Sequence, residues 1–343
     1  MLKIALDARM INKSGIGTYI KHIINSGYQV ILGNPSDGAT IPFFAKNYSI
    51  KEQLFFPYKK LRREKIDVLH VPHLNIPVFY KGKLVITIHD LTHLKYPQFL
   101  PSKFHYFYFR FMIGLACKKA SKILTVSENT KKDIIEFFNV KPDKISVTPL
   151  AAGKEFVHKN KSEVCYLQKK YRIPGAKKII LYVGNLLPHK NLNALLKAFD
   201  LLKNKDECCL VLVGKIFENR LKLNIEEQSV ICTGSVSQEE LVDFYNLSDL
   251  FVFPSLYEGF GLPVLESLAC GTPVACSNTS SLPEVGGNFA FYFDPENELD
   301  IANKIEAALN TKTNSLELCE YSRKFSWKKT AQATIHEINT LVH

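Results

Sequence analysis

The sequence has 343 residues, 46% of them apolar and 22% charged, which is enough chain for two domains that each bury a core. No apolar run approaches the ~18 residues of a membrane span. The first residues are interrupted by Asp7 and Arg9 and are too short for the apolar core of a signal peptide, so we expect no export signal.

Cysteine usage indicates a reducing compartment. The eight cysteines form no C-x-x-C pair, and most of them lie in apolar runs. Free cysteines in such runs behave as small buried hydrophobes, and disulfides are rare in the cytosol. We therefore expect reduced thiols in a cytoplasmic protein.

The net charge of +11 is unevenly distributed along the chain. Residues 1–160 hold 25 Lys and Arg against 11 Asp and Glu, a net charge of +14, whereas residues 161–343 hold 19 against 22, a net charge of −3. The first half is therefore expected to face an anionic partner.

The first half begins with an apolar strand over 2–6, followed by Gly15 and Gly17 in a loop that opens a helix. A G-x-G pair after a first strand suggests a dinucleotide-binding fold. However, position 20 is Ile instead of the third Gly, and no acidic residue ends the second strand at 28–33. We interpret the pair as a glycine turn that lets a ligand come close.

Two further strands are predicted at 68–71 and 84–88, and the second ends in His89 and Asp90. Ligands of open parallel sheets bind beyond the carboxyl ends of the strands, which is where this pair falls. A histidine held by its neighbouring carboxylate suits proton transfer or contact with a sugar hydroxyl. A purely structural role for the pair is the alternative.

Two segments interleave aromatic with basic residues, at 40–65 and at 99–112. The rings within 104–111 cover more than one face of a helix, so about half should pack in the core and the remainder should be exposed. A basic, aromatic surface can stack on nucleic acid or lie in the interface of an anionic membrane. For the exposed rings we favour membrane contact.

After a strand at 122–126, Ser127 is a good N-cap for a helix over 128–138. The stretch 150–175, rich in Lys, Gly and Pro, is interpreted as a linker. The second half then repeats the alternation of strands and helices, which predicts a second doubly wound α/β domain. Its expected strands are 178–184, 209–214, 230–234, 250–253 and 273–276, and its expected helices are 192–202, 238–246, 297–310 and 314–342.

The most informative stretch is 255–266, which follows a strand and runs into a helix. Its glycine turn lets the backbone approach a ligand, and Pro263 suits the first helical turn, where no N–H is needed. Free N–H groups at such a helix start attract phosphate. Glu258 and Glu266 flank the turn and could bind hydroxyls, as a nucleotide-sugar requires; an ordinary crossover with two surface glutamates is the alternative.

Several local patterns occur together in one known family. Glu258 and Glu266 are eight positions apart, 188–191 reads Pro-His-Lys-Asn, 280–284 reads Ser-Ser-Leu-Pro-Glu and 293–295 reads Phe-Asp-Pro. In these features the chain resembles the retaining family 4 glycosyltransferases of GT-B architecture. The resemblance is strongest over 178–295, with weaker echoes at 15–19, 87–90, 125–128 and 325–327.

The resemblance implies an α/β fold of the GT-B type, with two Rossmann-like doubly wound parallel-sheet domains facing across a cleft. Residues 1–155 would form an N-terminal acceptor-binding domain, and residues 172–326 a C-terminal nucleotide-sugar-binding domain. A C-terminal helix at about 327–343 would pack back on the first domain.

The resemblance also implies roles for individual residues. Glu258 would contact the donor sugar, Lys190 would neutralise the diphosphate and His89 would line the reacting sugar, while Glu266 would bind the ribose. The remaining implied donor contacts are the turn N–H groups of Phe260, Gly261 and Leu262, the glycines Gly15 and Gly17 beneath the diphosphate, Gly184 at the start of the lysine loop, and Lys215, Ser235 and Val236 in the loops 214–216 and 234–236 around the nucleobase.

The chain departs from the family at two places. Many relatives carry an arginine beside this lysine or after the first-domain glycines, whereas here those positions are His189 and Thr18. Phosphate binding should therefore depend more heavily on Lys190. No two aspartates are spaced as D-x-D, so we expect no metal and no other cofactor, and the diphosphate charge would be met by Lys190 and a helix N-terminus.

The expected function is transfer of a hexose from a nucleoside diphosphate sugar to a lipid-linked saccharide, in lipopolysaccharide O-antigen or capsule biosynthesis at the inner face of the cytoplasmic membrane. Mannose from GDP-mannose is our first expectation, with a UDP- or dTDP-sugar as the alternative. A front-face displacement and a covalent intermediate both remain open. A phosphorylase or a sugar-nucleotide epimerase of the same architecture would also fit, as would a nucleic-acid-binding protein that uses the basic first half. For the enzyme we expect no nucleic-acid partner.

Overall fold

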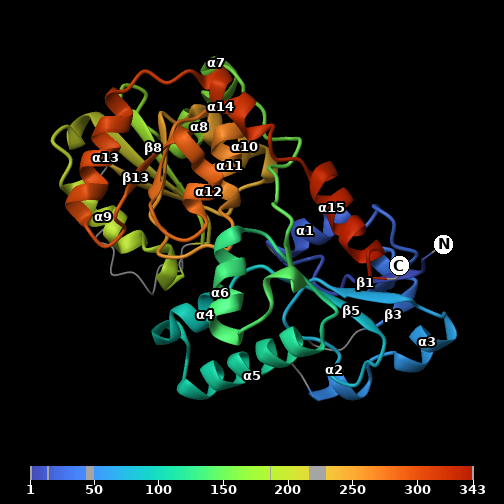
Figure 1. Ribbon diagram of the computed structural model, residues 1–343. Coiled ribbons are helices and arrows are strands. Elements are labelled where there is room, and N and C mark those ends of the chain that lie inside the picture. The colour runs from blue at the N-terminus through green and yellow to red at the C-terminus, as the bar shows by residue number, and fades with distance from the viewer. Residues whose placement is uncertain (1, 14, 44–49, 186, 216–228, 342–343) are drawn as a thin grey trace. The chain divides into compact units, whose positions relative to one another are not determined.

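The chain divides into two compact units (Figure 1). Unit 1 comprises Met1–Leu150 and Ser326–His343, and unit 2 comprises Ala151–Phe325. Among the described residues, no helix is both long and apolar enough to cross a membrane. The computed structural model describes residues 2–13, 15–43, 50–185, 187–215 and 229–341.

Unit 1 is built on a seven-stranded parallel sheet in the order β3-β2-β1-β4-β5-β6-β7. Its central strands are almost continuously apolar because helices cover both faces of the sheet. The strands are β1 Ile4–Asp7, β2 Val30–Gly33, β3 Ile41–Pro42, β4 Val68–Val71, β5 Lys83–Ile88, β6 Lys122–Thr125 and β7 Ile145–Val147. The helices are α1 Ile16–Ile23, α2 Ile50–Leu54, α3 Tyr58–Arg63, α4 Thr92–Lys95, α5 Lys103–Lys119, α6 Glu128–Phe138 and α15 Trp327–Asn339.

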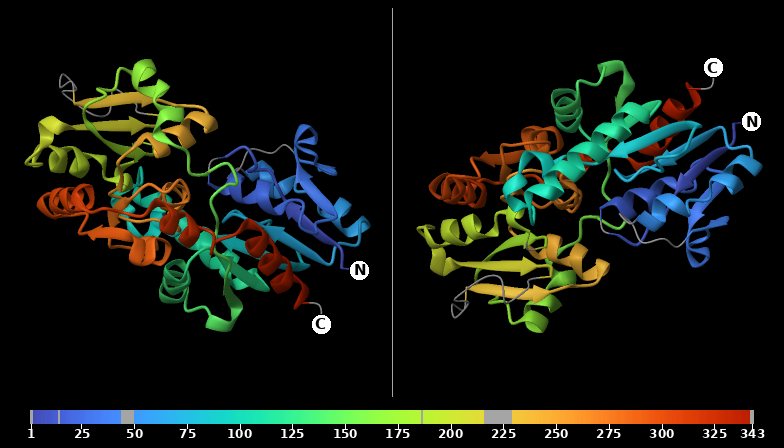
Figure 2. Two further views of the ribbon diagram at one scale, coloured as in Figure 1. Left: turned by 90° about the horizontal axis from the view of Figure 1, so that it is seen from above. Right: turned by 90° about the horizontal axis from the view of Figure 1, so that it is seen from below.

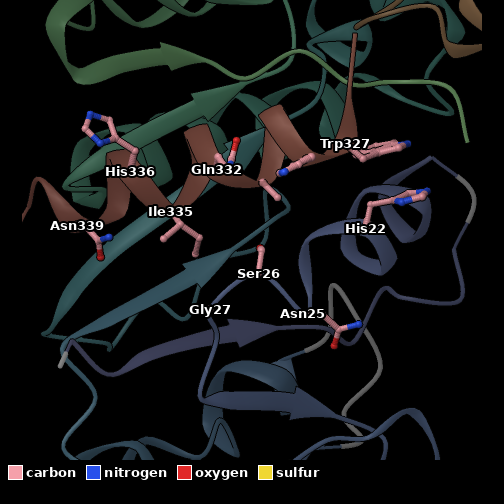
Figure 3. Close-up of a pocket in the computed structure, with 11 residues that line it drawn as sticks. His22, Asn25, Ser26, Gly27, Trp327, Gln332, Ile335, His336 and Asn339 are labelled. Carbon is pink, nitrogen blue, oxygen red and sulfur yellow. The ribbon is translucent and has the colours of Figure 1, made fainter. Parts of the chain in front are cut away.

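Helix α15 comes from the end of the chain and packs on α1 of unit 1. The rings of His22 and Trp327 stack with their centres 4.2 Å apart, and Ile338 is fully buried beneath the sheet. Figure 3 shows the two stacked rings at one end of a hollow of about 680 Å³ between these helices. The last helix is therefore part of the first unit, although the whole second unit precedes it in the sequence.

Unit 2 has a six-stranded parallel sheet in the order β10-β9-β8-β11-β12-β13. Figure 2 shows helices on both faces of each sheet. The strands are β8 Lys178–Val183, β9 Cys208–Val213, β10 Val230–Gly234, β11 Leu250–Phe253, β12 Val274–Ser277 and β13 Ala290–Phe293. The helices are α7 Lys161–Val164, α8 Tyr166–Tyr171, α9 Leu192–Asp200, α10 Gln238–Leu247, α11 Leu262–Ala269, α12 Leu282–Gly286, α13 Glu298–Asn310 and α14 Ser315–Ser322.

Two local predictions were wrong. The stretch 150–175 is not a plain linker, because Phe156, Val164 and Leu167 are buried in unit 2 and bring α7 and α8 with them. The single helix predicted over 314–342 is two helices, α14 and α15. The extended backbone at Ser326 separates them, and they belong to different units. The prediction of two parallel sheets is confirmed.

Candidate active site

The strand order of unit 2 creates a topological switch point between β8 and β11. From β8 the chain builds β9 and β10 on one side, and then crosses to place β11 on the other side. Ligands of open α/β sheets bind outside the carboxyl ends of the strands at such a point. Lys190 lies in the loop after β8 and Glu258 in the loop after β11, so both residues come from the strands that flank the switch point.

Lys190 and Glu258 form an ion pair, with 2.5 Å between Nζ and Oε1. The two side chains are only 18% and 14% exposed, and Nζ lies 5.2 Å from the centre of the Phe253 ring. The backbone N–H of Leu256 donates to the carbonyl of His189 at 2.8 Å, which joins the two loops directly. Partial shielding from water strengthens such a pair relative to an exposed one.

The glycine turn after β11 is held by two serines of the loop that follows β12. The N–H of Glu258 donates to Ser280 Oγ at 3.0 Å. Ser281 Oγ donates to the carbonyls of Glu258 and Phe260, at 3.0 and 2.8 Å. The Ser-Ser of the family-like pattern at 280–284 therefore fixes the backbone on which Glu258 stands.

Gly261 occupies the N-cap of α11 with φ 106°, in the left-handed region that favours glycine. A Cβ at this position would lie 2.6 Å from Cδ2 of Leu282. Within the part of the chain that the structure describes, the N–H groups of Phe260, Gly261 and Leu262 donate to no protein acceptor. The turn and the helix start thus present free donors, which is the arrangement that binds phosphate oxygens.

Glu266 lies one turn further along α11, where its Oε2 accepts a hydrogen bond of 3.0 Å from the hydroxyl of Tyr245. Burial raises the pKa of Glu266 to about 7; the bond from Tyr245 opposes this rise, and the charge of Glu155 adds to it. Glu266 therefore keeps its proton to a higher pH than an ordinary glutamate does. Tyr245, on α10, was missed by sequence reasoning because nothing local links it to the 255–266 element.

Three glycines lie at the carboxyl ends of three neighbouring strands: Gly184 follows β8, Gly214 follows β9 and Gly234 ends β10. Gly184 donates its N–H to the carbonyl of Val213, and Gly214 donates to the carbonyl of Gly234, both at 2.9 Å. Gly214 has φ 141°, and a Cβ there would lie 2.0 Å from the carbonyl oxygen of Gly184. Only glycine permits this approach between the backbones that follow β8 and β9.

The predicted nucleobase loops continue from these glycines. Lys215 and Ser235 are exposed and Val236 is half-buried, so their side chains are accessible to a ligand beyond the ends of β9 and β10. Ile216, the last residue of the predicted loop 214–216, lies outside the described residues. The contact of these loops with a nucleobase stays a prediction.

In unit 1 the two glycines differ in their surroundings. Gly15 is the N-cap of α1, and a Cβ there would meet open space. Gly17 lies inside the first turn of α1 and is buried, where a Cβ would lie 2.4 Å from the carbonyl oxygen of Ile11. Gly17 therefore serves close packing of the helix on the preceding loop, and the role of both glycines beneath a diphosphate stays a prediction.

His89 follows β5 directly, but its partner differs from the one we predicted. Its Nε2–H donates to the carbonyl of Pro72 at 3.2 Å, while Asp90 accepts the N–H of Thr92, the first residue of α4, at 2.9 Å. Burial lowers the pKa of His89 to about 4, against the opposing effects of Asp90 and the Pro72 bond. The neutral ring has Nδ1 as a hydrogen-bond acceptor, as contact with a hydroxyl requires.

Sequence reasoning missed a buried charged cluster at the carboxyl ends of β1 and β4. Arg9 contacts Asp7 at 2.5 Å and Glu52 at 2.6 Å, His73 Nε2 lies 3.3 Å from Asp7, and Asn75 donates to Glu52. Burial opposes ionisation of Asp7, yet the charge of Arg9 holds the pKa of Asp7 well below its usual range. The sequence does show that Asp7 and Arg9 lie at the end of a buried strand. It gives no indication that Glu52, 43 residues after Arg9, is the partner of Arg9.

Two family models match the chain, one in each half. A model described as "Glycosyl transferases group 1" matches residues 166–325, and a model described as "Glycosyltransferase Family 4" matches residues 26–151. The chain is 30% identical over 294 residues to O-antigen chain mannosyltransferase B of Escherichia coli, which covers 82% of this chain and 76% of that protein. The chain belongs to glycosyltransferase family 4.

As a member of family 4, the protein is a retaining glycosyltransferase. It is also 32% identical over 290 residues to the serotype-specific mannosyltransferase WbdA of Escherichia coli, and it spans about a third (35%) of that longer protein. The crystal structure of Anabaena HepE in complex with UDP-glucose matches 99% of this chain and 100% of that one, with a TM-score of 0.78 and 17% identity. The predicted GT-B architecture is confirmed.

Proposed function

We propose that this family 4 glycosyltransferase transfers a hexose from a nucleoside diphosphate sugar, and that the donor binds at the switch point of unit 2. The observation that carries the proposal is the contact of Lys190 with Glu258 beside the free N–H groups at the start of α11. One cation, one carboxylate and a helix N-terminus match the chemistry of such a donor, which carries a diphosphate and sugar hydroxyls.

In this proposal the donor replaces the internal ion pair. Lys190 and the N–H groups of Phe260, Gly261 and Leu262 bind the diphosphate, where they stabilise the charge that develops as it leaves. Glu258, released from Lys190, accepts hydroxyls of the sugar, and Glu266 accepts those of the ribose. A divalent metal is not required because the protein itself supplies the positive charge.

In the front-face displacement, the bond from the anomeric carbon to the phosphate oxygen breaks as the bond to the acceptor oxygen forms on the same face. The acceptor proton passes to an oxygen of the departing diphosphate. A covalent sugar-enzyme intermediate is the alternative, and it also retains the configuration. In either route, neutral His89 of unit 1 would accept a hydroxyl of the reacting sugar, and Gly15 and Gly17 would lie beneath the diphosphate.

For the donor we propose GDP-mannose. The two Escherichia coli relatives are both named mannosyltransferases, which favours this sugar. A UDP- or dTDP-sugar is the alternative, and the related HepE fold holds UDP-glucose. A thermal-shift panel of GDP, UDP, dTDP and CMP separates these, since a nucleotide at 100 times its Kd stabilises the protein by ~2.7 kcal/mol. Stabilisation by UDP and not by GDP would contradict the proposed donor.

For the acceptor we propose a lipid-linked saccharide of O-antigen or capsule assembly, bound by unit 1 at the inner face of the cytoplasmic membrane. The relative's name, O-antigen chain mannosyltransferase B, favours this acceptor class. The net positive charge of residues 1–160 suits an anionic surface. Family membership favours sugar transfer over a phosphorylase, an epimerase or a nucleic-acid-binding protein. Salt-sensitive binding of arbitrary single-stranded DNA, together with no turnover of any donor, would instead favour a nucleic-acid-binding protein.

The decisive test of the site is a comparison of Lys190→Ala with the parent protein, by titration calorimetry with GDP and by transfer from GDP-mannose. We expect both nucleotide affinity and turnover to fall. Unchanged nucleotide binding in a folded variant would remove Lys190 from the donor site and would contradict the proposal.

A further inference from the structure

Helix α5 of unit 1 carries an exposed aromatic stripe. Phe104, Phe107 and Phe111 are 75%, 64% and 67% exposed, and their spacing of three and four residues places them on one helix face. Gly114 and Lys118 continue the same spacing towards the C-terminal end of the helix. Figure 1 shows α5 along the lower edge of its unit in that view. Three large apolar rings in a row on a soluble surface mark a site of contact.

The stripe ends at a cavity of about 780 Å³. Gly114 and Lys118 belong to its wall, together with Phe138 at the end of α6. A Cβ on Gly114 would lie 3.3 Å from the Phe138 ring, which is a tight contact. Glycine at this position therefore leaves space beside Phe138, on the side of the cavity that faces the stripe. Four lysines and one acidic residue line the cavity, so it is strongly basic; the lysines are Lys118, Lys122, Lys141 and Lys144.

Two of these lysines are already engaged by the protein. Lys144 Nζ donates to the carbonyls of Cys117 and Lys118, at 2.8 and 3.4 Å, at the end of α5. Lys122 Nζ lies 2.8 Å from a carboxylate oxygen of Glu337. These contacts hold the cavity together where α5, β6 and α15 meet.

The other two lysines are available to a ligand. Lys118 and Lys141 are exposed, and among the described residues neither makes an ion pair. One lies at the end of the aromatic helix and the other in the turn after α6, so the cavity presents two ammonium groups from different elements. Two such groups beside an apolar wall suit a phosphate that carries apolar chains.

The cavity is separate from the expected reaction site of unit 1. Helix α5 ends just before β6, and Ser121, which lines the cavity, precedes the first residue of that strand. The cavity therefore lies at the amino edge of the sheet. His89 and the Asp7 cluster lie at the carboxyl edge, where ligands of such sheets react.

We propose that this cavity binds the phosphate headgroup of an anionic phospholipid, while the stripe of Phe104, Phe107 and Phe111 enters the membrane interface. The inference rests on the membrane association in the proposed function. It adds the class of lipid that is bound and the residues that bind it. The continuity of the rings with the basic cavity favours a lipid over a free phosphate, because a free phosphate has no apolar part for the stripe to contact. The volume lies within the range of ordinary ligand pockets.

The test uses the full chain with vesicles of phosphatidylcholine alone, and of phosphatidylcholine mixed with phosphatidylglycerol, in co-sedimentation. The variant is Lys118→Gln with Lys141→Gln. The control is Lys304→Gln with Lys312→Gln in unit 2, which removes the same charge away from the cavity. We expect the cavity variant to partition about 30-fold more weakly onto the anionic vesicles, about fivefold for each lysine, while the control stays within about twofold of the parent.

A second variant, Phe107→Ser with Phe111→Ser, should weaken binding to both kinds of vesicle. A parallel titration uses dihexanoyl phosphatidylglycerol below its micelle concentration against inorganic phosphate, and we expect saturable binding of the lipid alone. Equal losses in the two lysine variants would mean diffuse charge attraction, and tight binding of inorganic phosphate would mean a soluble ligand; either result overturns the inference. GDP binding, measured on the same samples, should be the same in the parent and in all variants. A parent protein that does not bind GDP would count against the proposed function and not against the lipid site.

Discussion

The raised pKa of Glu266 predicts an unusual dependence of stability on pH. In the unfolded chain this carboxyl loses its proton near its ordinary pKa of 4.5, whereas in the fold its pKa is about 7. Between these values the folded protein binds the extra proton, so the free energy of unfolding falls as the pH rises through this window. Glu266→Gln keeps an oxygen that accepts from Tyr245 and removes the charge, so it should abolish this dependence.

The magnitude follows from the two pKa values. Their difference corresponds to roughly 3 kcal/mol at ~1.4 kcal/mol per pKa unit. Since Glu266 is half-buried and keeps some contact with solvent, we expect about 1–2 kcal/mol. The variant should match the parent near pH 5 and exceed it by this amount near pH 8. For a unit of this size that is a rise in Tm of several degrees, at ~2–4 °C per kcal/mol.

The assay is thermal and urea unfolding of both proteins from pH 5 to pH 8, without nucleotide. Glu320→Gln, an exposed change on α14 of the same unit, is the matched control and should follow the parent at every pH. Parallel curves for Glu266→Gln and the parent would refute the reasoning, because a carboxyl that ionises freely in the fold has no such penalty to remove.

Four further predictions concern the proposed donor site and the strands around it. Lys190→Ala should lower turnover by ~10²-fold or more, since it removes a charge that acts on the departing diphosphate. Glu258→Gln should lower kcat by a similar ~10²-fold without unfolding the protein. Steady-state kinetics measures both effects, and circular dichroism checks that both variants are folded. Gly214→Ala should destabilise unit 2 by more than ~2 kcal/mol in urea unfolding because its Cβ would collide with Gly184. Gly234→Ala, with open space around its Cβ, should cost only ~1 kcal/mol, and equal effects would contradict the close approach. EDTA should leave transfer unchanged, and activity that disappeared and returned with Mg²⁺ would show that a metal supplies the charge.

Local sequence patterns predicted most of the strands and helices and marked the residues of the proposed donor site. The apolar runs predicted the central strands, and Ser127 was recognised as an N-cap, where its hydroxyl accepts the N–H of Thr130. The glycine turn and Pro263 marked the start of α11. These features depend on neighbours within a few residues, so the sequence carries them directly. The linker at 150–175 failed because composition does not reveal which of its few apolar residues are buried.

The sequence by itself determined that this protein has two parallel α/β sheets, that Lys190 and Glu258 lie in loops after strands, and that Glu266 lies inside the helix that follows the glycine turn. Only the tertiary structure decided that Lys190 contacts Glu258, 68 residues away, and that burial raises the pKa of Glu266 against the opposing bond from Tyr245. The same holds for the Arg9–Glu52 pair. Strand order and the exclusion of water set these contacts, and both arise from segments far apart in the chain, which no local pattern encodes.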